Sequence, residues 1–369
     1  MNPDYRYIAA NARTGDVLHW TLPLSDVEFG PELSGPGALS ASLTPAGARR
    51  LSDMLDAGDA VLLVERNGQL LWGGLLWRAQ PKGARLPVEA SGFTSYLHRR
   101  HDLHGNLDGR GPYIEADPCS VIRDVWTYAQ EQPDGDLGVV VDDTRSQART
   151  GTAKDPYTIP RQDARKLGEI VDEMADIDEG LEWSEAVTWR GRQAERRIIL
   201  GAPRLGRRRE DLTFTTGANV VGEPEVVKDA DGYAQWVIGL GDGEGKKRKI
   251  AVDGVRNGRL RLEHRLETNE KDQDKLQRRA RRDRLARQVL PTLTELEITD
   301  HPAAPIGALH VGDIVRIQLR EPHTAYDGWN RITGWTVRPG SGEMPERVTL
   351  KLERALKPED EQNDTEAQE

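Results

Sequence analysis

Three histidines in the segment HRRHDLHGN have the spacing closest to that of a metal site. His98, His101 and His104 recur at every third position, and Asp102 lies among them. On a helix, three side chains at this spacing spread over about 120° and do not converge on one ion. No HExxH pattern accompanies them. The sequence favours a polar loop here. A metal-dependent nuclease or a tail-borne cell-wall hydrolase that uses these histidines remains the enzymatic alternative.

The segment GLGDGEG at residues 239–245 has a glycine at every second position and superficially resembles a phosphate-binding loop. A dinucleotide site needs GxGxxG between a strand and a helix, with an acidic residue about 20 positions later. Here the glycines lead into the basic residues KKRK and then into another candidate strand. The pattern predicts a hairpin turn and no cofactor.

Residues 275–287 (KLQRRARRDRLAR) carry seven basic side chains on a predicted helix. A basic helix can bind phosphates, but Asp272, Asp274 and Asp283 interrupt the positive charge. An apolar seam of Leu276, Ala280, Ala286 and Val289 runs along the same segment. We therefore expect a helix face that is solvated or packed on another subunit, with any DNA contact incidental.

No other residues form a catalytic pattern. Cys119 is the only cysteine, which excludes an internal disulfide and a cysteine-based zinc site. We expect it to be a small buried residue at a helix start. No GxSxG elbow occurs, and the carboxylates are scattered. The sequence therefore predicts no catalytic, cofactor-binding or metal-binding residues and no enzyme activity.

Nine tryptophans against three phenylalanines leave a glycan-binding module open as a second alternative. Trp72, Trp77, Trp236 and Trp335 lie beside aliphatic residues in strand-like segments. Core packing is the ordinary explanation for tryptophans in such positions.

The 369 residues have a net charge of −10, and much of it comes from one end of the chain. Residues 358–369 (PEDEQNDTEAQE) hold six acidic and no basic side chains, which predicts a disordered acidic segment. The rest has 55 acidic and 51 basic residues, too balanced for a general nucleic-acid binder. The longest apolar run, residues 70–77, is far short of the roughly 20 residues of a membrane span, so no membrane insertion is expected.

Residues 1–105 are expected to form a β-barrel-like domain. Residues 60–65 and 70–79 read as two strands joined by Asn67-Gly68, a strong hairpin signal. Gly73-Gly74 predicts a bulge or bend in the second strand. Residues 85–91 form another candidate strand, while a Gly/Pro/Ser cluster occupies residues 30–37.

Residues 106–225 are expected to form an α+β domain. Asp117-Pro118 predicts a helix start, and Val121, Ile122, Val125, Trp126 and Ala129 give that helix one apolar face. A second helix is predicted from a stripe of apolar residues: Ala164, Leu167, Ile170, Val171 and Met174. Residues 181–190 and 197–200 read as strands.

Residues 226–357 are expected to form a second β-barrel-like domain. Its candidate strands are residues 233–240, 248–252, 313–319, 331–337 and 348–352. A long helix is predicted over about 269–290, ended by Pro291. The fold class is therefore α+β, with two small β-barrel-like domains on either side of a helix-containing middle region.

Several segments resemble the tail-hub, or baseplate-hub-like minor tail, proteins of long-tailed bacteriophages. Residues 62–77 (LLVERNGQLLWGGLLW) are similar to the hairpin that crosses the first barrel of that family. Residues 201–221 resemble the exit of its middle domain. Residues 309–319 (LHVGDIVRIQL), 331–337 and 348–352 resemble the strands of its final barrel, preceded by a long helix. The likeness extends over residues 5–355.

The resemblance implies a structural virion protein at the distal tail tip, assembled in the host cytoplasm. It implies a homotrimer whose six similar barrels join a three-fold tip to a six-fold tail tube and gate genome ejection. The implied partners are the distal tail protein and tail tube, the tape-measure protein, and receptor-binding or tail-fibre proteins. DNA would pass through the lumen without specific binding. Many relatives continue into adhesive or wall-digesting regions, so those activities are expected in partner proteins.

Overall fold

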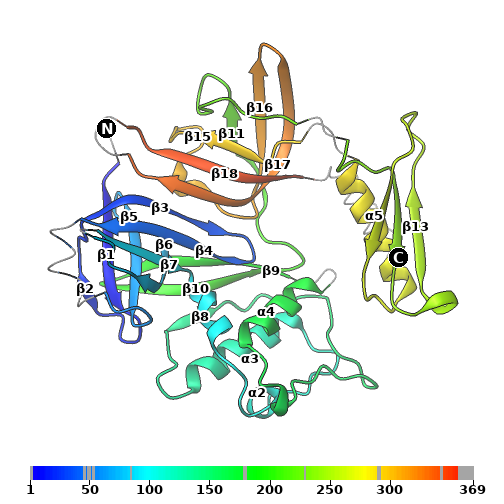
Figure 1. Cartoon of the computed structure of the whole chain (residues 1–369), viewed down its shortest axis with the longest axis horizontal. Helices are drawn as coiled ribbons and strands as arrows, with labels where there is room; N and C mark the ends of the chain where they lie inside the picture. The colour runs from blue at the N-terminus through cyan, green and yellow to red at the C-terminus, as the bar shows by residue number, and fades with distance from the viewer. Residues whose placement is uncertain are drawn as a thin grey trace. The chain divides into compact units, whose positions relative to one another are not determined.

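Figure 1 shows the computed structural model, which describes residues 3–44, 47, 51, 55–83, 85–177, 181–227, 230–288, 292–340 and 344–355. The chain divides into two compact units. The larger unit comprises Met1–Arg208, Glu297–Asp313 and Ile332–Leu350, and the smaller comprises Arg209–Leu296, Ile314–Arg331 and Lys351–Glu369. The division into 1–105, 106–225 and 226–357 stays a prediction. The acidic segment 358–369 lies outside the described residues.

The N-terminal strands form an antiparallel sheet in the order β3-β4-β7-β6-β5-β1-β2. These strands are β1 (Tyr5–Asn11), β2 (Val17–His19), β3 (Leu24–Glu32), β4 (Gly35–Leu43), β5 (Ala60–Arg66), β6 (Gln69–Ala79) and β7 (Leu86–Ser91). Beyond β3, Gly334 and Val337 of β17 (Thr324–Arg338) continue the sheet. The predicted β content is confirmed. Among the described residues no pairing closes this sheet into a barrel.

The β5–β6 hairpin forms where Asn67-Gly68 predicts it. Both turn residues have positive φ, 50° at Asn67 and 84° at Gly68, as a two-residue hairpin turn requires. All seven residues of β5 are buried, on both faces of the strand. The apolar run at residues 60–64 is typical of a strand covered on both sides, and the charged Glu65 and Arg66 follow it.

The bulge predicted at Gly73-Gly74 is wrong, because both glycines pair regularly with β5. The register shifts lie elsewhere, between Val64 and Glu65 and near Leu76. The glycines are required by close packing instead. A Cβ on Gly74 would lie 2.5 Å from the carbonyl oxygen of Ser91, so no side chain fits there.

Two helices of the larger unit pack on a three-stranded sheet in the order β8-β10-β9. The helices are α3 (Pro118–Glu131) and α4 (Leu167–Asp176), and the strands are β8 (Val139–Val141), β9 (Glu182–Arg190) and β10 (Gln193–Gly201). Short helices η2 (Phe93–Arg99), α2 (Asn106–Gly109) and η3 (Arg161–Asp163) complete this region. Figure 1 shows α2, α3 and α4 grouped together.

Helix α3 follows its sequence signals closely. The Asp117 carboxylate accepts a hydrogen bond of 2.9 Å from the backbone N–H of Cys119, which caps the helix start before Pro118. The five predicted face residues are all at most 1% exposed. Burial of one such aliphatic side chain stabilises a fold by about 1.5–3 kcal/mol, so this face anchors the helix.

Helix α4 buries four of the five residues in its predicted stripe. Ala164 is the exception: it lies before the helix, is exposed, and adopts a left-handed conformation after η3. The helix begins only after Lys166, so the predicted stripe was too long at its N-terminal end.

In the smaller unit, helix α5 (Gln273–Arg287) packs on a sheet in the order β13-β12-β14. The strands are β12 (Trp236–Leu240), β13 (Ile250–Gly254) and β14 (Glu263–Glu267), and η4 (Gly245–Lys247) lies in the β12–β13 connection. The same unit contains β11 (Arg208–Thr215) and β16 (Ile314–Glu321), next to the first half of β17. The other elements are β15 (Glu295–Ile298), η5 (Ile306–Ala308) and β18 (Arg347–Arg354).

Within the described residues, none of the helices combines the length and apolar character that a membrane span requires.

Candidate assembly surfaces

The three histidines of residues 98–104 turn to different partners. The Nε2 atom of His98 lies 3.7 Å from a carboxylate oxygen of Asp172 on α4. His104 Nδ1 is 2.9 Å from the Tyr128 hydroxyl. His101 is exposed and forms an isolated bridge with Lys166. In the described part of the chain, no three His, Cys, Asp or Glu side chains are grouped so as to hold a metal ion.

Asp102 has a structural task at the centre of the same segment. It is fully buried, and its carboxylate accepts hydrogen bonds from the backbone N–H groups of His104, Gly105 and Leu107 at 2.9–3.0 Å. A buried carboxylate with this many donors holds a loop in one conformation. The polar-loop interpretation therefore describes residues 101–104, whereas His98 lies in the short helix η2, where the prediction of a loop is wrong.

The arginine-rich helix α5 uses only part of its predicted apolar seam. Leu276 and Ala280 are buried against β12 and β13. Ala286 is exposed, which corrects the prediction. It follows Ala280 by six positions, about 240° around the helix axis, and so points away from the sheet. Val289 lies outside the described residues.

At least three arginines of α5 lie within ion-pair distance of acidic groups of the same unit. Arg284 pairs with Asp253 on β13, and Arg287 Nε lies 2.8 Å from Asp283. Arg279 Nε lies 3.9 Å from a carboxylate oxygen of Glu270, and its Nη1 donates a 3.0 Å hydrogen bond to the neutral Thr268 hydroxyl. The carboxylates offset part of the helix charge, so the run of arginines is not wholly free to bind phosphates.

The glycine-rich segment is a hairpin connection, as predicted. Strands β12 and β13 pair antiparallel on either side of it. Two of its glycines are also required by close packing, which the sequence pattern did not reveal. A Cβ on Gly239 would lie 3.2 Å from Leu276 of α5, and one on Gly241 would lie 2.6 Å from the carbonyl oxygen of Glu270. They permit the helix and its leading loop to approach the sheet.

On β12 and β13, the face of the same sheet opposite α5 is apolar. Ile250 and Val252 on β13 are 55% and 47% exposed. Trp236, Ile238 and Leu240 alternate with buried residues on β12 and are half-buried beside them. An exposed apolar row of this kind is typical of a surface that meets another protein. The prediction of core packing holds for Trp72 and Trp335 but not for Trp236, which lies on this outer face.

Glu185 is a half-buried glutamate whose role the sequence analysis did not predict. It projects from β9 to the start of η2, where its oxygens accept hydrogen bonds from the N–H groups of Phe93 (2.6 Å) and Thr94 (2.8 Å). Desolvation raises its pKa to about 7, although these hydrogen bonds act in the opposite direction. The group links the N-terminal sheet region to the α+β region. A lone glutamate in a strand gave no sequence signal for this role.

Cys119 is fully buried, as expected. Burial, assisted by the nearby charge of Asp117, raises the pKa of its thiol to about 12. A thiol of this kind stays protonated at neutral pH and is a poor nucleophile.

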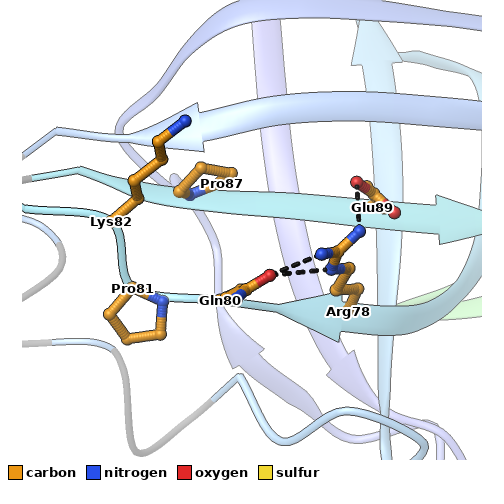
Figure 2. Close-up of a pocket in the computed structure, with 6 residues that line it drawn as sticks. All are labelled: Arg78, Gln80, Pro81, Lys82, Pro87 and Glu89. Atoms are coloured by element: carbon orange, nitrogen blue, oxygen red, sulfur yellow. Dashed lines mark hydrogen bonds and ion pairs between the residues drawn. The ribbon is translucent and has the colours of Figure 1, made fainter.

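An open depression of about 390 Å³ lies where β6 and β7 meet. Figure 2 shows Arg78 between two acceptors, with Nε 3.1 Å from the Gln80 side-chain oxygen and Nη1 3.4 Å from Glu89. Arg78 and Glu89 are more than half exposed. The other lining residues are Pro81, Lys82 and Pro87. The depression lacks the apolar enclosure of a small-molecule site.

Comparison with solved structures gives these surfaces a context. A tail protein from Neisseria meningitidis MC58 matches with a TM-score of 0.60 and 12% identity, over 95% of this chain and 97% of its own. The 43 kDa tail protein of prophage MuSo2 from Shewanella oneidensis matches with a TM-score of 0.61 and 11% identity, over 95% of this chain and 97% of its own. This chain has the fold of phage tail proteins. The resemblance inferred from the sequence is thereby confirmed.

Two further structures widen the comparison. The prophage tail protein gp18 from Listeria monocytogenes EGD-e matches with a TM-score of 0.55 and 11% identity, over 98% of both chains. The E. coli c3393 protein matches with a TM-score of 0.51 and 10% identity, over 96% of this chain and 75% of its own. That protein is described as a type VI secretion component similar to the T4 tail proteins gp27 and gp5. No protein-family model and no curated protein sequence matches this chain.

Proposed function

We propose that this protein is a structural component of a bacteriophage tail, and that three copies form the hub at its distal end. The observation that carries the proposal is the extent of the fold likeness, which covers 95–98% of this chain in matches to three phage tail proteins. A match over both ends and the middle supports the same role for the whole chain. The role is structural and not catalytic.

In this proposal each chain supplies two comparable β-rich modules, so three chains present six modules to a six-fold tail tube. Closing such a ring needs two different complementary faces on each subunit. Obligate interfaces of this kind commonly bury more than about 2,000 Å². The hub would contact the distal tail protein and tube on one side, and fibre or receptor-binding proteins on the other. The tape-measure protein and the genome would occupy its lumen.

The paired arginines of α5 agree with a lumen that lets DNA pass. A channel lined with free cations would hold the phosphates and slow ejection. We propose that α5 faces protein and not the bore. Arginines lining the bore of an assembled hub would contradict this placement.

The test is native mass spectrometry and electron microscopy of the full chain, alone and with the distal tail protein of the same phage. The expected result is a ring with the mass of three chains. A chain that stays monomeric in both conditions would contradict the hub. Zymography and a nuclease assay, each with and without chelator, test the structural role, because wall clearing or DNA cleavage would favour an enzyme.

A further inference from the structure

Strand β14 is an open edge of the sheet in the smaller unit, and its charges alternate. In the described part of the chain it pairs only with β12. Arg261, Glu263, Arg265 and Glu267 follow one another at every second position, so they share the face of the strand opposite α5. Within one copy Arg261 pairs with Glu263 and Arg265 pairs with Glu267, but all four side chains are 46–62% exposed and can also reach a second strand.

The backbone of β14 is oriented for further pairing. The carbonyl oxygen of Leu262 accepts from the N–H of Trp236, and the N–H of Thr268 donates to Leu240. Even-numbered residues therefore direct their peptide groups toward β12. Peptide groups alternate in direction along a parallel strand, so Glu263 and Arg265 direct theirs toward the open side.

The opposite edge of this sheet is protected. The side chains of Gln273 and Gln277 on α5 donate hydrogen bonds of 2.9 and 3.2 Å to the carbonyl oxygens of Ile250 and Val252 on β13. Covering an edge in this way prevents unwanted strand pairing. Such protection on β13 leaves β14 as the edge at which a strand can be added.

We propose that β14 pairs antiparallel with β14 of a second copy of this chain, with His264 at the two-fold axis. In this register Arg261 lies opposite Glu267 of the second copy, and Glu263 lies opposite Arg265 of the second copy. The Arg and Glu residues of this face then all lie opposite a residue of the other charge, which favours pairing. If the two strands slip so that the axis moves to residue 263 or 265, Arg lies opposite Arg and Glu opposite Glu. Parallel pairing of the two strands in register also sets each charge opposite its own copy. Among the antiparallel registers, the proposed one joins the largest number of opposite charges.

The other face of β14 supports the same contact. Leu262 and Leu266 are only half-buried by the unit itself. In the proposed register, Leu262 lies opposite Leu266 of the second copy, so pairing removes more of both side chains from water. The contact is two-fold and isologous. It is separate from the three-fold ring proposed above, and each can fail without the other.

The test compares the full chain with single charge reversals by analytical ultracentrifugation at low salt, where exposed charges are least screened. The wild type is expected to show a concentration-dependent two-fold association. Arg265→Glu and Glu263→Arg each place like charges opposite each other twice in the pair. Each is expected to raise the dissociation constant at least about tenfold. An equimolar mixture of the two variants restores every opposite-charge pair and should associate as well as the wild type.

Arg256→Glu is the matched control, since it reverses an exposed arginine of the same unit beyond the end of β13. It should associate like the wild type. The proposal is overturned if the wild type shows no two-fold association, if Arg265→Glu behaves like Arg256→Glu, or if the mixture fails to associate. A trimer that is unaffected by Arg265→Glu would support the hub and reject the β14 contact.

Discussion

Arg66 and Glu346 lie 280 positions apart and form a two-point ion pair inside the larger unit. Arg66 Nε is 3.0 Å from Oε1 of Glu346, and Nη2 is 2.8 Å from Oε2. Only 9% and 5% of the two side chains are exposed. Nη2 of Arg66 also lies 2.7 Å from Asp300, and the Tyr5 hydroxyl donates to Glu346. The first strands are thus tied to the C-terminal part of the unit through buried charges.

Replacing Arg66 by Met should strongly destabilise the larger unit. The change leaves the carboxylate of Glu346 buried without its cation, and breaking a buried pair from one side typically costs about 3–5 kcal/mol. Urea denaturation, followed by the fluorescence of buried tryptophans such as Trp126 and Trp183, measures this loss in the free energy of unfolding.

Arg347, which follows Glu346 in the chain, provides the control. Arg347 pairs with Glu297 at 2.6 Å, but its side chain is 55% exposed. An exposed pair contributes about 0–1 kcal/mol, so Arg347→Met should change little. Equal effects at Arg66 and Arg347 would show that the buried pair does not anchor the unit.

Stability should fall between about pH 4.5 and 7 because of Glu185. Its pKa is about 7 in the folded protein against an ordinary value of 4.5. Between these values the folded state retains a proton that the unfolded state releases, so rising pH favours unfolding. Because the residue is partly exposed, solvent screens part of this effect. We therefore expect the free energy of unfolding to fall by about 2 kcal/mol between pH 4.5 and 7.

Glu185→Gln is the matching variant, since its amide resembles the protonated carboxyl and does not titrate. Its free energy of unfolding, measured by urea denaturation at several pH values, should lack this fall. The difference between variant and wild type should therefore grow from pH 4.5 to 7 and then stay level. Parallel curves for the two proteins would exclude a raised pKa at Glu185.

The elements that the sequence predicts well are those with local causes. The β5–β6 turn depends on two adjacent residues, Asn67 and Gly68, and the start of α3 depends on Asp117 and Pro118. Their conformational preferences act over a few positions and need no knowledge of the rest of the fold. The period-two strands β16 and β18 are equally local in origin.

Features with distant causes escaped prediction. The Gly/Pro cluster at residues 30–37 belongs mostly to β3 and β4, with a turn only at residues 33–34. A Cβ on Gly30 would lie 1.7 Å from the carbonyl oxygen of Trp335, a residue 305 positions later. The partners of Arg66 and Glu185 are similarly remote. Such contacts exist only once the chain has folded, so residue types and spacing do not reveal them.

Alanine substitutions at Gly239 and Gly241 should differ in their effects on the smaller unit. The new methyl group at Gly239 meets side-chain atoms of Leu276 at 3.2 Å, which can shift slightly. At Gly241 it meets the backbone oxygen of Glu270 at 2.6 Å, which cannot move without displacing the loop before α5. We expect a loss of about 1–3 kcal/mol for Gly241→Ala and less than about 1 kcal/mol for Gly239→Ala.

Hydrogen exchange of the α5 amides measures this difference, because exchange reports the local opening of the helix. Faster exchange in Gly241→Ala than in Gly239→Ala is the expected order. The reverse order would mean that side-chain crowding under α5, and not the loop backbone, limits the approach of the helix to the sheet.

Freeing the arginines of α5 should strengthen DNA binding relative to the wild type. Asp253 and Asp283 each pair with one arginine, Arg284 and Arg287 respectively. Replacing both aspartates by asparagine removes two negative charges and leaves two guanidinium groups without carboxylate partners. Each cation that contacts a phosphate adds roughly 0.9 to the salt dependence of binding, so the log–log slope should steepen by about 2. Fluorescence anisotropy with duplex DNA over a range of salt concentrations measures it.

The control for this experiment makes the same charge change without releasing an arginine. Asp242 and Glu244 are exposed carboxylates in the β12–β13 connection of the same unit. Asp242→Asn combined with Glu244→Gln should leave DNA binding near the wild-type level, because net charge changes while α5 keeps its ion pairs. If both double variants bind DNA equally, net charge governs binding and the pairing on α5 is irrelevant. If the wild type binds as tightly as the Asp253/Asp283 variant, its arginines are free to contact phosphates, and the placement of α5 away from the genome channel loses its physical basis.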